Sequence, residues 1–308
     1  MANCLIIGAN GFIGSHLIDQ LVAEGHEVTA FDRFSSGNVL YDAKGVRQII
    51  GDFANLANLR AAVTGQDAVF HMLSATSPIT AEDDPSLDIR SNVAQTVDLL
   101  GICVDAGVER FYFASTGGAI YGPQDRQSFE ETDLATPVSP YAIGKLAIEN
   151  YLRYFKVKHG LDSVAFRISN PYGTRQHPNR LQGLVPIAAR QIVAGKPVIR
   201  YGDGSMIRDY VYVRDLVRMM ALTVNREPIF DVYNLGSGQG HSVTEILDCL
   251  ATVSGRELEI RELPVPPTFV HHVVLNTSRF QSEFGKIELT PLEIGTTEVV
   301  REALDFRT

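Results

Sequence analysis

The sequence lacks the features that mark several classes of protein. It contains only three cysteines, Cys4, Cys103 and Cys249, and they are far apart. Such a set provides neither a disulfide framework nor metal ligands, so we predict no metal and a reducing, cytoplasmic location. No apolar run approaches the length of a membrane span, and no basic leader precedes the first predicted strand. We therefore expect no membrane partner and no signal peptide.

An excess of positive charge is also missing. The formal net charge of -9 over 308 residues argues against a nucleic-acid partner. One region differs, because nine basic residues stand against three acidic ones between Arg167 and Arg218. This local excess suggests a pocket for a small anion, although the alternative is that several of these arginines are simply solvated.

Hydrophobic patterning divides most of the chain into alternating strands and helices. Strands are predicted at Cys4–Ile7, Glu27–Phe31, Arg47–Ile50, Ala68–His71, Arg110–Ala114, Val164–Ile168 and Val211–Val213. Helices are predicted at Phe12–Glu24, Leu56–Val63, Leu87–Ala106, Tyr141–His159, Val185–Ala194 and Val243–Val253. This alternation predicts an α/β fold, a Rossmann-type doubly wound parallel sheet followed by a smaller mixed α/β C-terminal lobe.

A glycine loop links the first strand to the first helix. Glycines at this place let the backbone turn tightly and approach a pyrophosphate, which the N–H groups at the helix start can bind. We predict that the loop binds a dinucleotide through Gly8, Asn10, Gly11, Phe12, Ile13 and Gly14.

Two carboxylates follow the next strands. Asp32 ends the second strand at the spacing expected for a group that binds the ribose diol, and it would repel a 2′-phosphate. We therefore predict NAD as the cofactor. Asp52, followed by Phe53, is placed to reach the adenine amino group, and the alternative is that Asp52 caps the next helix.

A tyrosine and a lysine four residues apart, Tyr141 and Lys145, would share one face of a helix. A fixed ammonium near the phenol favours the phenolate and makes it a base for a sugar hydroxyl. The strand that ends at Ser115 and Thr116 would bring hydroxyls to the same crevice.

Together these motifs make the chain similar to the extended short-chain dehydrogenase/reductase superfamily, and most closely to its UDP-glucose 4-epimerase-like enzymes. The resemblance also rests on Asn170-Pro171-Tyr172-Gly173 and Arg208-Asp209-Tyr210-Val211-Tyr212-Val213. It implies a catalytic set of Thr116 or Ser115, Tyr141 and Lys145, and a homodimer formed through the helices near Leu87–Ala106 and Tyr141–His159.

The resemblance assigns three further residues. Asn92 would hold the nicotinamide side, while Asn170 and Arg208 would contact the substrate diphosphate. For Asn92 the alternative is a buried polar residue bonded to the backbone. For Arg208 it is an ion pair with Asp209 or Asp215.

The resemblance also separates candidate reactions. Related dehydratases carry an acidic pair after the catalytic Thr, whereas this chain has Gly117-Gly118 and no acid before Tyr121. Elimination of water needs extra acid–base groups, so we predict a 4-epimerase for a UDP-hexose or UDP-N-acetylhexosamine. The alternatives are a 4,6-dehydratase or oxidoreductase of the same superfamily, and a dinucleotide-binding sensor without turnover.

The chain departs from its relatives in one stretch. The segment Pro264–Val273 lacks the arginine that grips the diphosphate in many of them, and His271 or His272 could partly replace it. By domain, we expect residues 1–168, with a return segment at about 205–235, to bind NAD. Residues 169–308 would form the interleaved substrate lobe.

Overall fold

The computed structural model describes residues 1–308 except 36, 77, 178–182, 267–268 and 306–308. Seven parallel strands form the main sheet in the order β10-β6-β5-β4-β1-β2-β3. They are β1 Asn3–Ile7, β2 Glu27–Asp32, β3 Val46–Ile50, β4 Ala68–His71, β5 Arg110–Thr116, β6 Asp162–Ile168 and β10 Val232–Leu235. The chain starts in the interior and winds outward in both directions, which confirms the predicted doubly wound fold.

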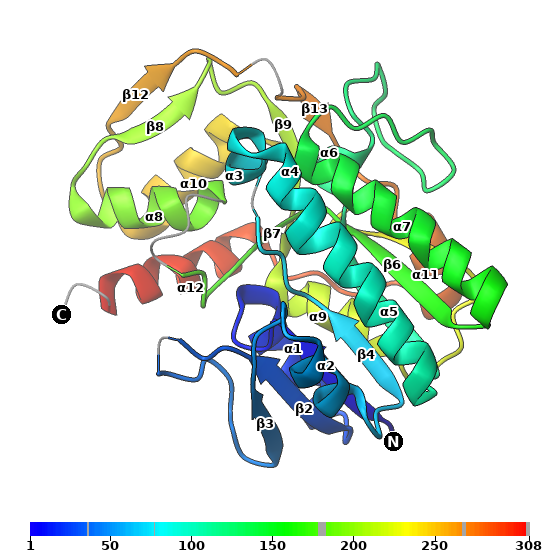
Figure 1. Ribbon diagram of the computed structural model, residues 1–308. Helices are drawn as coiled ribbons and strands as arrows, with labels where there is room; N and C mark the ends of the chain where they lie inside the picture. Colours follow the sequence, from blue (N-terminus) through cyan, green and yellow to red (C-terminus); the bar gives the residue numbers. More distant parts are fainter. Residues whose placement is uncertain (36, 77, 178–182, 267–268, 306–308) are drawn as a thin grey trace.

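Helices cover both faces of this sheet (Figure 1). On one face α1 (Phe12–Ala23) packs against α9 (Val213–Leu222), and on the other α2 (Leu56–Val63), α5 (Gln95–Ala106) and α7 (Pro140–His159) lie side by side. Successive strand side chains point to opposite faces, so β1 gives Cys4 and Ile6 to one core and Leu5 and Ile7 to the other.

The predicted helix Leu87–Ala106 is not a single regular helix. It is divided into α4 (Pro85–Asp88), a π-helical turn η1 (Ile89–Ala94) and α5, and a short α3 (Pro78–Asp83) precedes it. Periodicity alone predicted one element because the apolar positions continue through the wider turn. Such turns occur frequently at functional sites.

The C-terminal part contains a small mixed sheet and a strand pair. The mixed sheet consists of β7 (Asn170–Tyr172), β9 (Ile207–Tyr212), β11 (Gly240–Ser242) and β13 (His272–Val273). The pair is β8 (Val198–Tyr201) with β12 (Ile260–Leu263). The helices here are α8 (Leu184–Ala194), α10 (Val243–Ser254), α11 (Ser278–Phe284) and α12 (Leu292–Asp305), and α8, α10 and α12 pack together (Figure 1).

The predicted strand Val211–Val213 is wrong at its end. The strand is β9, which ends at Tyr212, and Val213 begins α9. Val213, Leu216 and Val217 recur at helical spacing and are buried. Propensity favoured a strand there because the run Tyr210–Val213 is rich in aromatic and β-branched residues.

Candidate active site

The glycine loop between β1 and α1 has the close backbone approach that a pyrophosphate requires. Gly8 adopts a positive φ of 85°, and a Cβ on Gly14 would lie 2.2 Å from the Gly8 carbonyl oxygen. Gly11 is the N-cap of α1 and offers no side chain to cap it. The first N–H groups of α1 are therefore left for an anionic ligand.

Asp32 lies at the end of β2, beside this loop. Its Oδ2 accepts a hydrogen bond from the Asn10 N–H (3.0 Å) and its Oδ1 accepts one from the Arg33 N–H (2.7 Å). Asn10 in turn bonds Asn38 O and Leu40 N through its side chain. The carboxylate is thus hydrogen-bonded to the glycine loop itself.

Asp52 does not cap α2, so that alternative is wrong. The N-cap is Asn55, whose Oδ1 accepts hydrogen bonds from the N–H groups of Ala57 and Asn58. Among the described residues the Asp52 carboxylate accepts a hydrogen bond only from the Ala54 N–H (2.9 Å), and Asp52 is exposed. The Phe53 ring is buried and stacked on His71, which leaves its backbone for any ligand contact.

Helix α7 carries the tyrosine–lysine pair. Ser139 caps the helix by accepting from the Ala142 N–H, and Pro140 occupies the first turn, so Tyr141 and Lys145 lie at the start of the helix. Lys145 is buried, donates to the Ala114 carbonyl (2.8 Å), and lies 5.6 Å from the centre of the Tyr141 ring.

The electrostatic surroundings of Lys145 suit a base beside it. Burial lowers the pKa of Lys145 to about 8, while the carboxylates of Asp88 and Glu149 act in the opposite direction. The ammonium therefore remains mostly charged at neutral pH and can favour the phenolate of Tyr141.

The two hydroxyls at the end of β5 differ in their contacts. Ser115 Oγ donates to Glu149 Oε1 at 2.5 Å, so this hydroxyl is bound within the protein. Thr116 is also buried, yet its hydroxyl makes no hydrogen bond to any residue that the structure describes. Of the pair, Thr116 is the one free to act on a ligand.

A buried ion pair fills the space behind Ser115. Glu149 Oε2 accepts from Arg167 Nη2 at 2.8 Å, and each side chain is 7% exposed. Arg167 also donates to the hydroxyl of Tyr121 (3.1 Å) and to the carbonyl of Glu131. These contacts fix α7 against the ends of β5 and β6.

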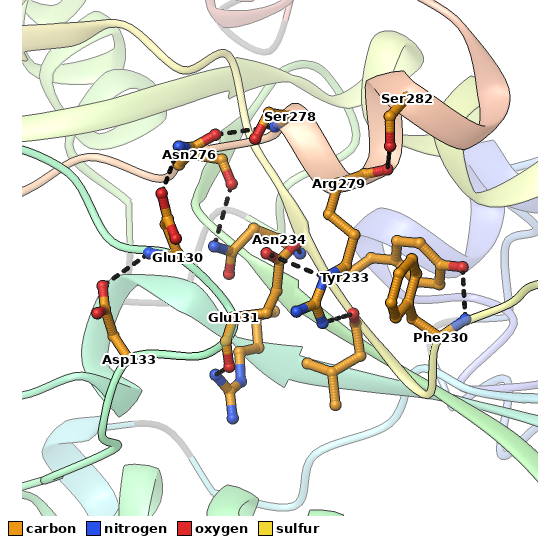
Figure 2. Close-up of polar contacts among 12 residues, drawn as sticks. Glu130, Glu131, Asp133, Phe230, Tyr233, Asn234, Asn276, Ser278, Arg279 and Ser282 are labelled. Carbon is orange, nitrogen blue, oxygen red and sulfur yellow. Dashed lines mark hydrogen bonds and ion pairs between the residues drawn. The ribbon is translucent and has the colours of Figure 1, made fainter.

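Further polar contacts join the loop that carries Glu131 to β10 and to Asn276 and Arg279 (Figure 2). The Asn234 N–H donates to Glu131 Oε1 (2.8 Å), and Asn234 Nδ2 donates to the carbonyls of Phe129 and Asn276. Arg279 lies 3.5 Å from the Glu131 carboxylate. The loop between α6 (Gly117–Ile120) and α7 is thus held by strands and loops distant in sequence.

The glycines after Thr116 have different surroundings. A Cβ on Gly117 would lie 2.5 Å from a methyl group of Leu275 and 2.8 Å from the Arg167 carbonyl oxygen. A Cβ on Gly118 would have only ordinary contacts, with the Asn170 side chain at 3.6 Å. Position 118 therefore has room for a Cβ next to Asn170, and position 117 does not.

Asn92 is buried, and both ends of its side-chain amide are hydrogen-bonded within the protein. Its Oδ1 accepts from the Ala75 N–H (2.8 Å), and its Nδ2 donates to Thr76 Oγ1 and Asp88 Oδ1 (2.8 Å each). The alternative of a buried polar residue bonded to the backbone therefore describes this structure. Asn92 holds the loop after β4, beside the carboxyl ends of the central strands.

Arg208 forms no ion pair with Asp209 or Asp215, so that alternative is wrong. Its guanidinium donates to the carbonyls of Ile207 (2.8 Å), His271 (3.1 Å) and Val270. Among the described residues no carboxylate lies within 4.0 Å of it. Because the carbonyl oxygens that accept from the Arg208 guanidinium carry no net charge, its positive charge remains available to a bound anion.

Other arginines of the basic region are neutralised. Five of the nine basic residues form ion pairs with carboxylates, namely Arg167, Arg175, Arg200, Arg214 and Arg218. Arg180 lies outside the described residues. The local excess counted from the sequence therefore does not form one large anion pocket, and Arg208 stands apart from it.

Asn170 and the two candidate histidines complete the predicted set. Asn170 Nδ2 donates to the Asp209 carbonyl (3.1 Å), beside Gly118. His271 Nε2 lies 3.2 Å from Ser205 Oγ, and its carbonyl holds Arg208. The buried Nδ1 of His272 has no hydrogen-bond partner among the described residues. Part of the segment 264–273 lies outside those residues.

Sequence reasoning missed three buried charged residues around α7: Asp88, Glu149 and Arg167. A signal existed for one of them, because Glu149 lies four residues after Lys145 and thus on the same helix face as the pair. Arg167 was counted only as one of the nine basic residues in the region 167–218, and no pattern marks Asp88.

No described helix is long and apolar enough to cross a membrane. In the same part of the chain, no group of three or more His, Cys, Asp or Glu side chains is arranged to hold a metal ion.

The chain is similar to known proteins in both sequence and structure. The model of the NAD dependent epimerase/dehydratase family matches residues 4–236. A UDP-glucose 4-epimerase of Mycolicibacterium smegmatis is 34% identical over 82% of each chain. The structure of UDP-glucose 4-epimerase from Thermus thermophilus in complex with NAD has a TM-score of 0.91 at 34% identity and covers 98% of both chains. A dTDP-glucose 4,6-dehydratase from Streptomyces venezuelae with NAD bound is also similar, with a TM-score of 0.91 at 28% identity over 99% and 98% of the chains.

Proposed function

Because the chain belongs to the NAD-dependent epimerase/dehydratase family, we propose that it is a nucleotide-sugar 4-epimerase that works by transient oxidation at C4 of the sugar. NAD, the cofactor predicted from the glycine loop and Asp32, is the cofactor of that family. Gly8, Gly11 and Gly14 give the backbone approach and the free helix N–H groups that a pyrophosphate needs. Asp32 would bind the ribose.

The observation that carries the choice of epimerase over dehydratase is the lack of a usable acid at the end of β5. The turn from Gly117 to Ile120 contains no carboxylate. The carboxylate of Glu149 is next to Ser115, but it is already engaged by that hydroxyl and by the guanidinium of Arg167. Elimination of water needs an additional proton donor, whereas inversion at C4 needs only the base, its helpers and the hydride carrier.

In the proposed mechanism Tyr141 removes the proton of the sugar 4-hydroxyl and later returns it. Lys145, positively charged and buried beside it, stabilises the phenolate. Thr116 donates a hydrogen bond to the sugar oxygen as it becomes a ketone. Bound NAD⁺ would accept the C4 hydride and give it back to the opposite face of the ring. Atoms and electrons balance over the cycle, so no external oxidant is consumed.

We assign the substrate diphosphate to Arg208 and Asn170. Arg208 is half-buried, and desolvation lowers its pKa, yet its charge has no carboxylate partner among the described residues. A diphosphate would supply that partner. On this basis residues 1–168, with the return segment at about 205–235, hold the cofactor, and the remainder of 169–308 holds the nucleotide sugar.

The test is the interconversion of UDP-glucose and UDP-galactose, and of their N-acetyl forms, followed by sugar analysis. We expect a 4-epimer product without added NADH, and a loss of at least about a hundredfold in kcat for Tyr141→Phe. A 4-keto-6-deoxy sugar would identify a dehydratase instead. Tight NAD binding without turnover of any nucleotide sugar would identify a sensor.

A homodimer through α5 and α7 is also part of this proposal. The outer face of α7 exposes Ile143, Tyr151 and Tyr154 at helical spacing, and Val157 follows at 84% exposure. Tyr154→Arg should convert the dimer to a monomer in light-scattering measurements. Ile229→Arg, a change of an apolar residue that is 75% exposed and outside these helices, is the control and should leave the dimer intact.

A further inference from the structure

Lys145 is a buried cation without an adjacent carboxylate. Its Nζ donates to the Ala114 carbonyl (2.8 Å) and lies 4.6 Å from the centre of the Phe113 ring. Among the described residues no carboxylate oxygen lies within 4.0 Å of it. A buried charge without compensation is costly and tends to lose its proton, so some group at longer range must keep it charged.

Three elements bring titratable groups toward Lys145. Its own helix carries Tyr141 and Glu149, β4 carries His71, and α4 carries Asp88. His71 is neutral, because burial and the charge of Lys145 lower its pKa to about 3. It offers no negative charge.

Glu149 is already neutralised by another cation. Its carboxylate forms the buried 2.8 Å ion pair with Arg167 and also accepts from Ser115. At the distance of Lys145, the opposite charges of this pair largely cancel. Glu149 is therefore a weak partner for the ammonium.

Asp88 differs from Glu149 in this respect. It is 2% exposed, and its Oδ1 accepts from Thr76 Oγ1 and Asn92 Nδ2, both neutral donors. Among the described residues no Lys, Arg or His lies within 4.0 Å of it. The Asp88 charge is thus buried, held in place and not cancelled locally.

The packing of α4 on α7 brings this charge close to the catalytic turn. A Cβ on Gly144 would lie 2.1 Å from Asp88 Oδ2, so only glycine permits the approach. The π-helical turn η1 begins immediately after Asp88 and carries Asn92, which lets both side chains face the same interior point. Gly144 is the neighbour of Lys145 in sequence.

We propose that Asp88 is a positioning residue whose carboxylate, packed against Gly144, is the counter-charge that keeps Lys145 protonated beside Tyr141. The arrangement uses Thr76 and Asn92 to hold the carboxylate and Gly144 to admit it. Asp88 acts through Lys145 and need not touch cofactor or substrate. The proposal rests on the proposed roles of Tyr141 and Lys145, and it does not depend on which sugar is bound.

The test is a pH titration of Lys145 by NMR of the full chain labelled at lysine 13Cε, with the Lys145 signal assigned by its loss in Lys145→Met. In Asp88→Asn, which keeps the shape and the acceptor oxygen but removes the charge, we expect the midpoint to fall by about one pH unit or more. Asp83→Asn removes an equal charge from an exposed position on the neighbouring α3 and should leave the midpoint unchanged.

A nearby opposite charge usually shifts a pKa by far more than about 0.2 pH units. If the Lys145 titration midpoint in Asp88→Asn lies within about 0.2 pH units of its value in the unchanged chain, the proposal is wrong. Should that variant not fold, Gly144→Ala serves instead, since its methyl group must displace Asp88 Oδ2 and lower the midpoint in the same direction. The titration requires no substrate. A chain that shows the shift but interconverts no nucleotide sugar would overturn the epimerase and leave the role of Asp88 standing.

Discussion

Glu149 and Arg167 form a buried ion pair immediately behind the end of β5, with 2.8 Å between Oε2 and Nη2. The pair joins the helix that carries Tyr141 and Lys145 to the strand next to the one that carries Thr116. The pair therefore supports the geometry of the site, because it fixes the position of α7 relative to β5 and β6.

Removing one member of the pair should be far more harmful than removing both. Glu149→Ala leaves Arg167 as an unpaired buried charge, so we expect a loss of about 3–5 kcal/mol in the free energy of unfolding, measured with urea. The double variant Glu149→Leu/Arg167→Met should recover most of this loss. Lys156→Ala breaks the exposed pairs with Asp162 and Asp231 and should cost less than about 1 kcal/mol. Equal losses in the single and double variants would contradict this account.

Substitutions that remove the two hydroxyls at the end of β5 should have different effects on kcat. Thr116→Val removes the hydroxyl that has no hydrogen-bond partner among the described residues, and it should lower kcat by about 10²–10³ with little change in stability. Ser115→Ala removes only the hydrogen bond to Glu149, so it should reduce the free energy of unfolding by about 1–3 kcal/mol and largely preserve kcat. The reverse pattern would make Ser115 the catalytic hydroxyl.

Lys145 should make stability depend on pH in the alkaline range. Its pKa is lowered from 10.5 to about 8 in the folded protein, so between these values the unfolded chain binds the additional proton. The free-energy cost of burying the charged ammonium is present in full below pH 8 and is lost as the pH rises toward 10.5. We expect the stability of the unchanged chain to rise over this interval relative to Lys145→Met, in urea unfolding at several pH values. A constant difference would show that the lysine titrates normally.

Gly14→Ala should weaken NAD binding, because its Cβ would lie 2.2 Å from the Gly8 carbonyl oxygen and force α1 away from the loop. A displacement that costs about 1–3 kcal/mol corresponds to roughly a tenfold to hundredfold increase in Kd. Calorimetric titration with NAD measures it. Gly101→Ala is the matched control, since no atom lies within 4 Å of its Cβ and the change should stabilise α5 by about 0.5–1 kcal/mol. An unchanged Kd for Gly14→Ala would refute the assignment of this loop.

The sheet and the glycine loop were predictable from the sequence because their determinants are local. Strands such as Ala68–His71 and the helix Leu56–Val63 have the predicted bounds, and apolar periodicity alone marks them. The π-helical turn was not predictable, since its hydrogen bonding depends on how Asp88 and Asn92 pack under α7.

The contacts that distinguish similar residues depend on tertiary structure. Ser115 and Thr116 are equivalent in sequence, and only the position of Glu149, 34 residues later, separates them. Arg208 is followed directly by an acid, yet the Asp209 carboxylate accepts hydrogen bonds from Ser237 and Leu275. The Arg208 guanidinium instead donates to carbonyls near residue 270. Sequence spacing does not encode such pairings.

The polar contacts around Asn234 also bear on whether the cofactor-binding part could exist alone. The family match ends at residue 236, but Asn276 and Arg279, which follow it, complete the hydrogen bonds and ion pairs of Asn234 and Glu131 (Figure 2). Leu275 likewise supplies a donor to the buried Asp209. A fragment cut after residue 236 would therefore carry several desolvated polar groups without partners, and a minimal NAD-binding fragment of this chain would have to retain residues 275–279.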